Sequence, residues 1–113
     1  MTLVVGKVTA KGTKENVLDM FNNLDEYYDK YLCSQSGTND DYTIVFDYSK
    51  RMSTFFCSDS FLYLSEEYDC EISAQMTNDD GDPCGIIDLH YNRGEMIRGL
   101  KDNGIDPEDW EDF

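Results

Sequence analysis

The chain carries 24 acidic and 9 basic residues among 113, and its formal net charge of −15 repels nucleic acid and anionic lipid, so we expect neither as a direct partner. A length of 113 residues with 40% hydrophobic content favours one domain, residues 1–100, followed by an acidic C-terminal tail, residues 101–113. No apolar run approaches the roughly 20 residues that span a bilayer, and residues 1–12 lack the pattern of a signal peptide, which predicts a cytoplasmic location.

The N-terminal third predicts one strand followed by one long helix. Residues 3–9 are rich in β-branched side chains, which favours a strand that Gly12 ends. Apolar residues then recur at steps of three and four, which predicts an amphipathic helix over residues 14–32 with Thr13 as its N-cap. Residues 34–41 follow as an expected polar connection. The apolar positions of the helix are Val17, Leu18, Phe21, Leu24, Tyr28, Tyr31 and Leu32.

The middle of the chain predicts a strand and a second, shorter helix. Residues 42–48 have the strongest β-propensity and predict the central strand, with the even-numbered side chains on one face. Residues 52–57 fit either a further strand or a loop that covers the edge of the core, and the pattern does not decide between them. A helix is expected from Ser58 or Asp59, either of which suits an N-cap, to about Tyr68.

Residues 69–91 contain the clearest pattern of the chain, in which two stretches alternate apolar with polar side chains on either side of a turn-forming segment, residues 78–83. This pattern predicts an antiparallel hairpin. Residues 92–94 predict another turn and residues 95–98 a short edge strand, while residues 106–107 suit the start of one helical turn. The apolar face of the hairpin consists of Cys70, Ile72, Ala74, Met76, Ile87, Leu89 and Tyr91.

Four stretches carry a family pattern over most of residues 2–98: VVGKVTAKGTKENVLDMFNNL, YTIVFDY, LSEEYDCEISAQM and GDPCGIIDLHYNRGE. Together they resemble the YubB-like ferredoxin-like domain of small proteins from conjugative plasmids and phages. The resemblance implies an α+β fold, with a ferredoxin-like antiparallel sheet of 4–5 strands and two helices on one face. It also implies an origin in a mobile element, so the expected location is the host bacterial cytoplasm, and it supplies no catalytic residues.

No motif predicts catalysis, a cofactor or a metal site, so we expect a protein that is not an enzyme. His90 is the only histidine, and a solvated strand histidine explains it better than a Cys-His nucleophilic pair. The four cysteines contain no Cys-x-x-Cys pair, which favours buried free thiols over zinc ligands or a disulfide. An EF-hand alignment on Gly81 fails because it puts Met76 and Ile87 at positions that need oxygen ligands.

The negative charge is concentrated downstream of residue 37. Residues 1–37 hold five acids and four bases, whereas residues 38–113 hold nineteen acids and five bases. Duplex DNA carries about one charge per 1.7 Å, and an array of carboxylates can occupy a basic groove in its place. This distribution indicates a DNA mimic that binds a basic protein surface. The residues expected to bind the partner are Asp79, Asp80 and Asp82 at the hairpin turn and Asp106, Glu108, Asp109, Trp110, Glu111 and Asp112 in the tail.

The charge and the resemblance together predict a phage or mobile-element inhibitor of a bacterial defence nuclease. A CRISPR effector is the first choice of target, which would make the protein an anti-CRISPR inhibitor, and a restriction enzyme is the second. The alternative is a non-catalytic accessory module that binds another protein of the same mobile element. In that case the acidity serves solubility only.

Overall fold

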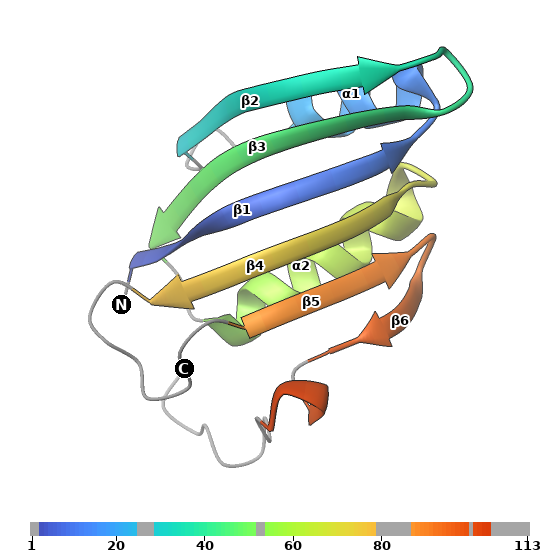
Figure 1. Cartoon of the computed structure of the whole chain (residues 1–113). Helices are drawn as coiled ribbons and strands as arrows, with labels where there is room; N and C mark the ends of the chain where they lie inside the picture. The colour runs from blue at the N-terminus through green and yellow to red at the C-terminus, as the bar shows by residue number, and fades with distance from the viewer. Residues whose placement is uncertain (1–2, 25–28, 52–53, 79–86, 100, 105–113) are drawn as a thin grey trace.

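The computed structural model describes residues 3–24, 29–51, 54–78, 87–99 and 101–104, and these residues form one antiparallel sheet and two α-helices (Figure 1). The strands are β1 (Leu3–Gly12), β2 (Asp29–Gly37), β3 (Tyr42–Arg51), β4 (Glu71–Asn78), β5 (Ile87–Asn92) and β6 (Glu95–Arg98). The helices are α1 (Lys14–Asn22), α2 (Thr54–Glu67) and a short 3-10 helix, η1 (Lys101–Asn103). No helix in this described part is long and apolar enough to cross a membrane.

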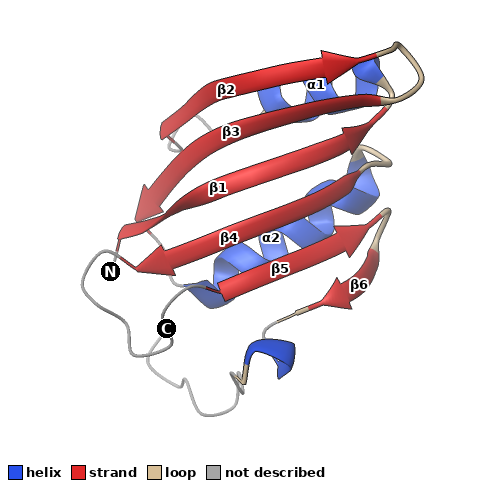
Figure 2. Ribbon diagram, in the orientation of Figure 1, coloured by secondary structure: helices blue, strands red, loops and turns tan. Residues whose placement is uncertain are grey.

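The strands lie in the order β2-β3-β1-β4-β5-β6, and each neighbouring pair is antiparallel. Both α-helices lie on the same face: α1 contacts β1 and β3, and α2 contacts β4 and β5 (Figure 2). Neither helix covers the opposite face, which we name the open face. The α+β class and the one-sided helix layer are therefore confirmed, whereas the expected 4–5 strands are corrected to six.

The core lies between the helices and the sheet, because alternate side chains of each strand point to the same face. Phe21 of α1 packs edge-on against Phe46 at a centroid distance of 5.0 Å, and Phe61 of α2 packs edge-on against Tyr48 at 5.4 Å. The even-numbered face predicted for residues 42–48 is buried, and so is the predicted apolar face of the hairpin. The buried strand residues are Val8, Ala10, Tyr42, Ile44, Phe46, Tyr48, Ile72, Ala74, Met76, Ile87, Leu89 and Tyr91.

Helix α1 begins as predicted but ends at Asn22, so the expected helical length is wrong. Thr13 is the N-cap, and its Oγ1 accepts a hydrogen bond from the Asn16 N–H at 3.2 Å. At the other end both the backbone N–H (3.0 Å) and the side-chain Nδ2 (2.8 Å) of Asn23 donate to the carbonyl of Asp19. Asparagine is a weak helix former whose side chain competes for backbone groups, so the Asn22-Asn23 pair ends the helix.

Residues 29–37 form strand β2, where the sequence predicts the second half of the helix and part of a polar connection. Tyr31 is 72% exposed while Leu32 packs against the core, and this alternation fits a strand and not one face of a helix. A β-bulge at Cys33 shifts the pairing between Leu32 and Ser34. Beyond the bulge, Gln35 Oε1 accepts a hydrogen bond from the Tyr42 hydroxyl at 2.6 Å. This strand is the one that the predicted sheet lacks.

Helix α2 starts at Thr54, so residues 54–57 are helical and neither alternative for residues 52–57 is correct there. Residues 54–60 contain no glycine or proline, so nothing in the sequence delays the helix until Ser58 or Asp59. The helix ends near the predicted position. Its last carbonyls accept hydrogen bonds in a Schellman pattern around Asp69, whose φ is 49°.

The predicted hairpin and the predicted edge strand are both present. Strands β4 and β5 pair from Glu71↔Asn92 to Met76↔Ile87. The turn between β5 and β6 has two residues with positive φ, Arg93 at 49° and Gly94 at 85°, as in a type I′ turn. The predicted turn before β5 and the predicted helical turn at residues 106–107 fall, in whole or in part, outside the described residues.

Candidate functional site

The predicted partner-binding residues fall into two segments, which we name the tip segment, residues 79–82, and the tail segment, residues 106–112. Both lie outside the residues that the structure describes. The roles of Asp79, Asp80 and Asp82 and of Asp106, Glu108, Asp109, Trp110, Glu111 and Asp112 therefore stay predictions. What the structure does describe is the sheet to which both segments are attached.

Two hydrogen bonds join the beginning of β5 to η1. The Asp88 N–H donates to Asn103 Oδ1 at 3.0 Å, and Asn103 Nδ2 donates to the Asp88 carbonyl at 2.7 Å. Asn103 Nδ2 also donates to the Gly99 carbonyl at 2.7 Å, and Asp102 Oδ2 accepts from the Gly99 N–H at 2.8 Å. The described chain resumes at β5 after the tip segment and stops just after Asn103 before the tail segment. The described stretch that follows the tip segment and the described stretch that precedes the tail segment are therefore neighbours in space.

The described acids gather at the opposite end of the sheet, where β1 and β5 end and β3, β4 and β6 begin. The register places Gly12 beside Tyr42, and Glu71 beside both Lys11 and Asn92. One ion pair, between Arg93 Nε and Asp69 Oδ1 at 3.4 Å, forms there between exposed side chains. We name this end the acidic end; its acids are Glu15, Asp40, Asp41, Glu66, Glu67, Asp69, Glu71 and Glu95.

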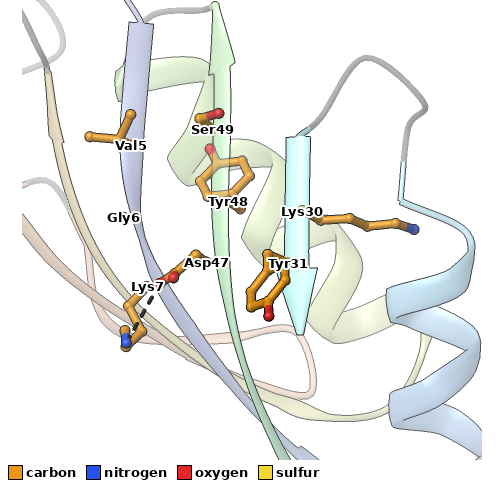
Figure 3. Close-up of a pocket in the computed structure, with 8 residues that line it drawn as sticks. All are labelled: Val5, Gly6, Lys7, Lys30, Tyr31, Asp47, Tyr48 and Ser49. Carbon is orange, nitrogen blue, oxygen red and sulfur yellow. Dashed lines mark ion pairs between the residues drawn. The ribbon is translucent and has the colours of Figure 1, made fainter. Parts of the chain in front are cut away.

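The open face differs from the acidic end because its acids and bases are nearly balanced in number. Lys7 of β1 lies opposite Asp47 of β3, and their side chains form an ion pair at 3.5 Å. Together with Tyr31 they line a shallow depression of about 590 Å³ (Figure 3). Lys30 points away from it toward α1, where its Nζ donates to the Phe21 carbonyl. The sequence marks these odd-numbered positions as polar, but only the register brings Lys7 to Asp47.

His90 lies on the open face in a second depression of about 340 Å³. Its cross-strand neighbour is Ser73, and its Nε2 lies 3.2 Å from Glu71 Oε2, so serine, histidine and glutamate are adjacent. In the described structure His90 Nε2 has no hydrogen-bond partner, so the contact with Glu71 is an ion pair only when the imidazole is protonated. Ser73 makes no hydrogen bond to His90 there either. The activated nucleophile of a catalytic triad is therefore not assembled.

The two cysteines whose side chains are described do not pair with His90. Cys33 is exposed on β2. Three strands lie between β2 and β5, the strand of His90, so the two strands are about 19 Å apart. Cys70 is buried, and its burial raises the pKa of the thiol to about 11, so the thiol stays protonated at neutral pH. Both are free thiols, as predicted, although Cys33 is not buried. Within the described residues no group of three or more His, Cys, Asp or Glu is placed to hold a metal ion.

Comparisons of the chain with protein-family models, with curated proteins and with solved structures find no match.

Proposed function

We propose that the protein is a non-catalytic inhibitor, encoded by a phage or another mobile element, of a bacterial defence nuclease. It binds the basic nucleic-acid groove of the target through the carboxylates of the tip and tail segments. A CRISPR effector is the first proposed target and a restriction enzyme the second. The proposed fold is a ferredoxin-like domain related to the YubB-like family. The order β2-β3-β1-β4 with helices after β1 and β3 supports it, and β5 and β6 extend the sheet.

The observation that carries the proposal is the pair of hydrogen bonds between Asp88 and Asn103. The tip segment holds three acids and the tail segment five, and neither contains a base. These bonds hold together the described stretches that follow the tip segment and precede the tail segment, which supports the proposal that the eight carboxylates act together. A local density of this kind is what a basic groove recognises in place of a nucleic acid.

Inhibition then follows from competition for the same basic side chains. A groove that holds DNA or RNA is lined by lysine and arginine, and a carboxylate array binds these groups in place of the phosphates. The long-range field of a molecule with a net charge of −15 accelerates the encounter with such a groove. Exposed ion pairs are screened by salt, so binding weakens as the ionic strength rises.

The test is a DNA-cleavage assay with a purified CRISPR effector, and separately with a restriction enzyme, titrated with the protein. We expect inhibition that weakens with salt and that the triple variant Asp79→Asn, Asp80→Asn, Asp82→Asn weakens about 10- to 100-fold. Each exposed charge pair contributes up to about 1 kcal/mol, which sets this range. The matched control is Asp40→Asn, Asp41→Asn, Glu66→Gln, which removes the same charge from the acidic end.

Equal losses in the two triple variants would show that only the total charge matters and would remove the tip segment from the proposal. Inhibition that neither variant changes would place the interface elsewhere on the molecule. If no defence nuclease is inhibited, the alternative gains support, namely an accessory module that binds a protein of its own element and is acidic only for solubility.

A further inference from the structure

The open face has almost equal numbers of acids and bases, although the chain as a whole is strongly acidic. Its apolar and aromatic groups include Val5, Val45 and the exposed ring of Tyr31, all on the side of the sheet that α1 and α2 leave uncovered. A balanced face attracts neither a basic nor an acidic partner by its net charge. Among the described side chains, the bases of the open face are Lys7, Lys11 and Arg98, and its acids are Asp47, Glu71, Asp88 and Glu95.

Two of these bases lie beside an acid on the neighbouring strand. Lys7 of β1 has Asp47 on one side and Gln75 on the other, and Lys11 has Glu71 as its neighbour on β4. A pair such as Lys7 and Asp47 is complementary to a copy of itself, once the copy is shifted by one strand. An isologous dimer about a two-fold axis produces such a shift.

We propose that the open face binds a second copy of this chain, with a two-fold axis that runs along the strands between β1 and β3. The axis exchanges the two strands, so Lys7 of each copy faces Asp47 of the other, and Thr9 faces Val45. Tyr31 on β2 then faces Gln75 on β4 beside the depression of about 590 Å³ that Lys7, Tyr31 and Asp47 line (Figure 3). Tyr31 of each copy therefore covers Gln75 of the other, and the contacts between Lys7 and Asp47 lie at the centre of the interface.

The occupant is a second copy because the centre of the face presents a base and an acid side by side. A basic surface that matches Asp47 meets Lys7 one strand away, and an acidic surface has the reverse problem. Because the axis runs along the strands, it places the acidic ends of the two copies at the same end of the dimer. Salt screens part of the resulting repulsion, because the Debye length is about 8 Å at physiological salt.

The test is the mass of the full chain in solution, measured by analytical ultracentrifugation or light scattering at physiological salt. We expect twice the chain mass of 13.0 kDa for the unmodified protein. Lys7→Asp and Asp47→Lys, each alone, place like charges across the axis and raise the dimer dissociation constant at least about tenfold. An equimolar mixture of the two variants restores both opposite-charge contacts and therefore forms a heterodimer. The double variant K7D/D47K restores the homodimer.

The charge-matched control is Lys14→Asp, which makes the same change on α1, on the covered side of the sheet, and leaves the dimer intact. The double variant also rebuilds the ion pair within each chain, so recovery of the fold can be checked separately by thermal unfolding. A monomeric unmodified protein at about 100 μM overturns the proposal, because a dimer with a dissociation constant well above this concentration is too weak to be specific. Single variants that dimerise like the unmodified protein, or a mixture that stays monomeric, overturn it as well.

Discussion

Ser65 shows how one polar side chain can join two elements through the core. It is fully buried among the described residues, and its hydroxyl donates to the Leu62 carbonyl at 2.8 Å while it accepts from the Gly94 N–H at 3.1 Å. Burial of a hydroxyl is costly unless it is paired, and both bonds here satisfy it. The serine therefore holds α2 against the β5–β6 turn, a role that its position in an apolar helix sequence does not predict.

Cys70 makes the stability of the protein depend on pH in the alkaline range. Burial raises the pKa of its thiol from 9.0 to about 11, and Asp69 adds to the rise whereas Arg93 opposes it. In the unfolded chain the thiol ionises near pH 9, so the stabilisation is complete below pH 9 and is lost as the pH rises through 11. We expect the free energy of unfolding in urea to fall by up to about 2 kcal/mol more in the unmodified protein than in Cys70→Ala over this interval.

The control for this pH dependence is Cys33→Ala, since Cys33 is exposed. It should follow the unmodified protein across the interval, and tyrosines and lysines titrate equally in all three chains. Parallel stability curves for the unmodified protein and Cys70→Ala would contradict the prediction.

At the scale of whole elements, the sequence predicts the interior strands and misses the edge strand β2. Strands β1, β3, β4 and β5 are half-buried and have neighbours on both sides, so burial imposes a visible alternation on their side chains. Strand β2 is an edge strand whose second half, Cys33 to Gly37, is polar and exposed. Its pairing with β3 depends on backbone hydrogen bonds, which leave no pattern in the sequence. Tyr31 and Leu32 in the first half of β2 extend the apparent helix instead.

The residues of the candidate site also differ in whether the sequence reveals them. The tip and tail segments stand out in the sequence because they are runs of acids, and their role stays a prediction. The bonds between Asp88 and Asn103 and the ion pair between Lys7 and Asp47 link residues that are far apart in the chain. No local pattern can reveal such pairs, because they exist only once the strands have taken their register.

Strand β1 depends on a glycine where it passes β4. A Cβ at Gly6 would lie 2.1 Å from the carbonyl oxygen of Gln75 and 2.7 Å from Met76 Sδ, whereas the nearest atom to a Cβ at Gly12 is Cys70 Cβ at 3.2 Å. Gly6→Ala therefore forces the central strands apart, and we expect it to cost about 3 kcal/mol of unfolding free energy. Gly12→Ala, the matched change on the same strand, should cost about 1 kcal/mol or less. Urea denaturation measures both, and equal losses would contradict this account of β1.

At the scale of the whole molecule, the balance of acids and bases differs from one region of the chain to another. The open face is balanced, the acidic end carries exposed carboxylates, and the tip and tail segments hold eight further acids. This division allows two kinds of contact on one small domain, a salt-sensitive one through the segments and a self-complementary one through the sheet. It also means that much of the repulsion within the folded chain comes from residues outside the core.

The net charge of −15 should therefore make thermal stability increase with salt. Like charges repel one another in the folded chain, and this repulsion is screened when the Debye length falls from about 30 Å at 0.01 M to about 3 Å at 1 M salt. We expect the melting temperature, followed by circular dichroism, to rise by several degrees over this range of sodium chloride. The variant with Asp106→Asn, Glu108→Gln, Asp109→Asn, Glu111→Gln and Asp112→Asn should start higher at low salt and rise less. A melting temperature that is insensitive to salt, or an equal rise in both proteins, would mean that the tail carboxylates lie too far from the other charges to repel them.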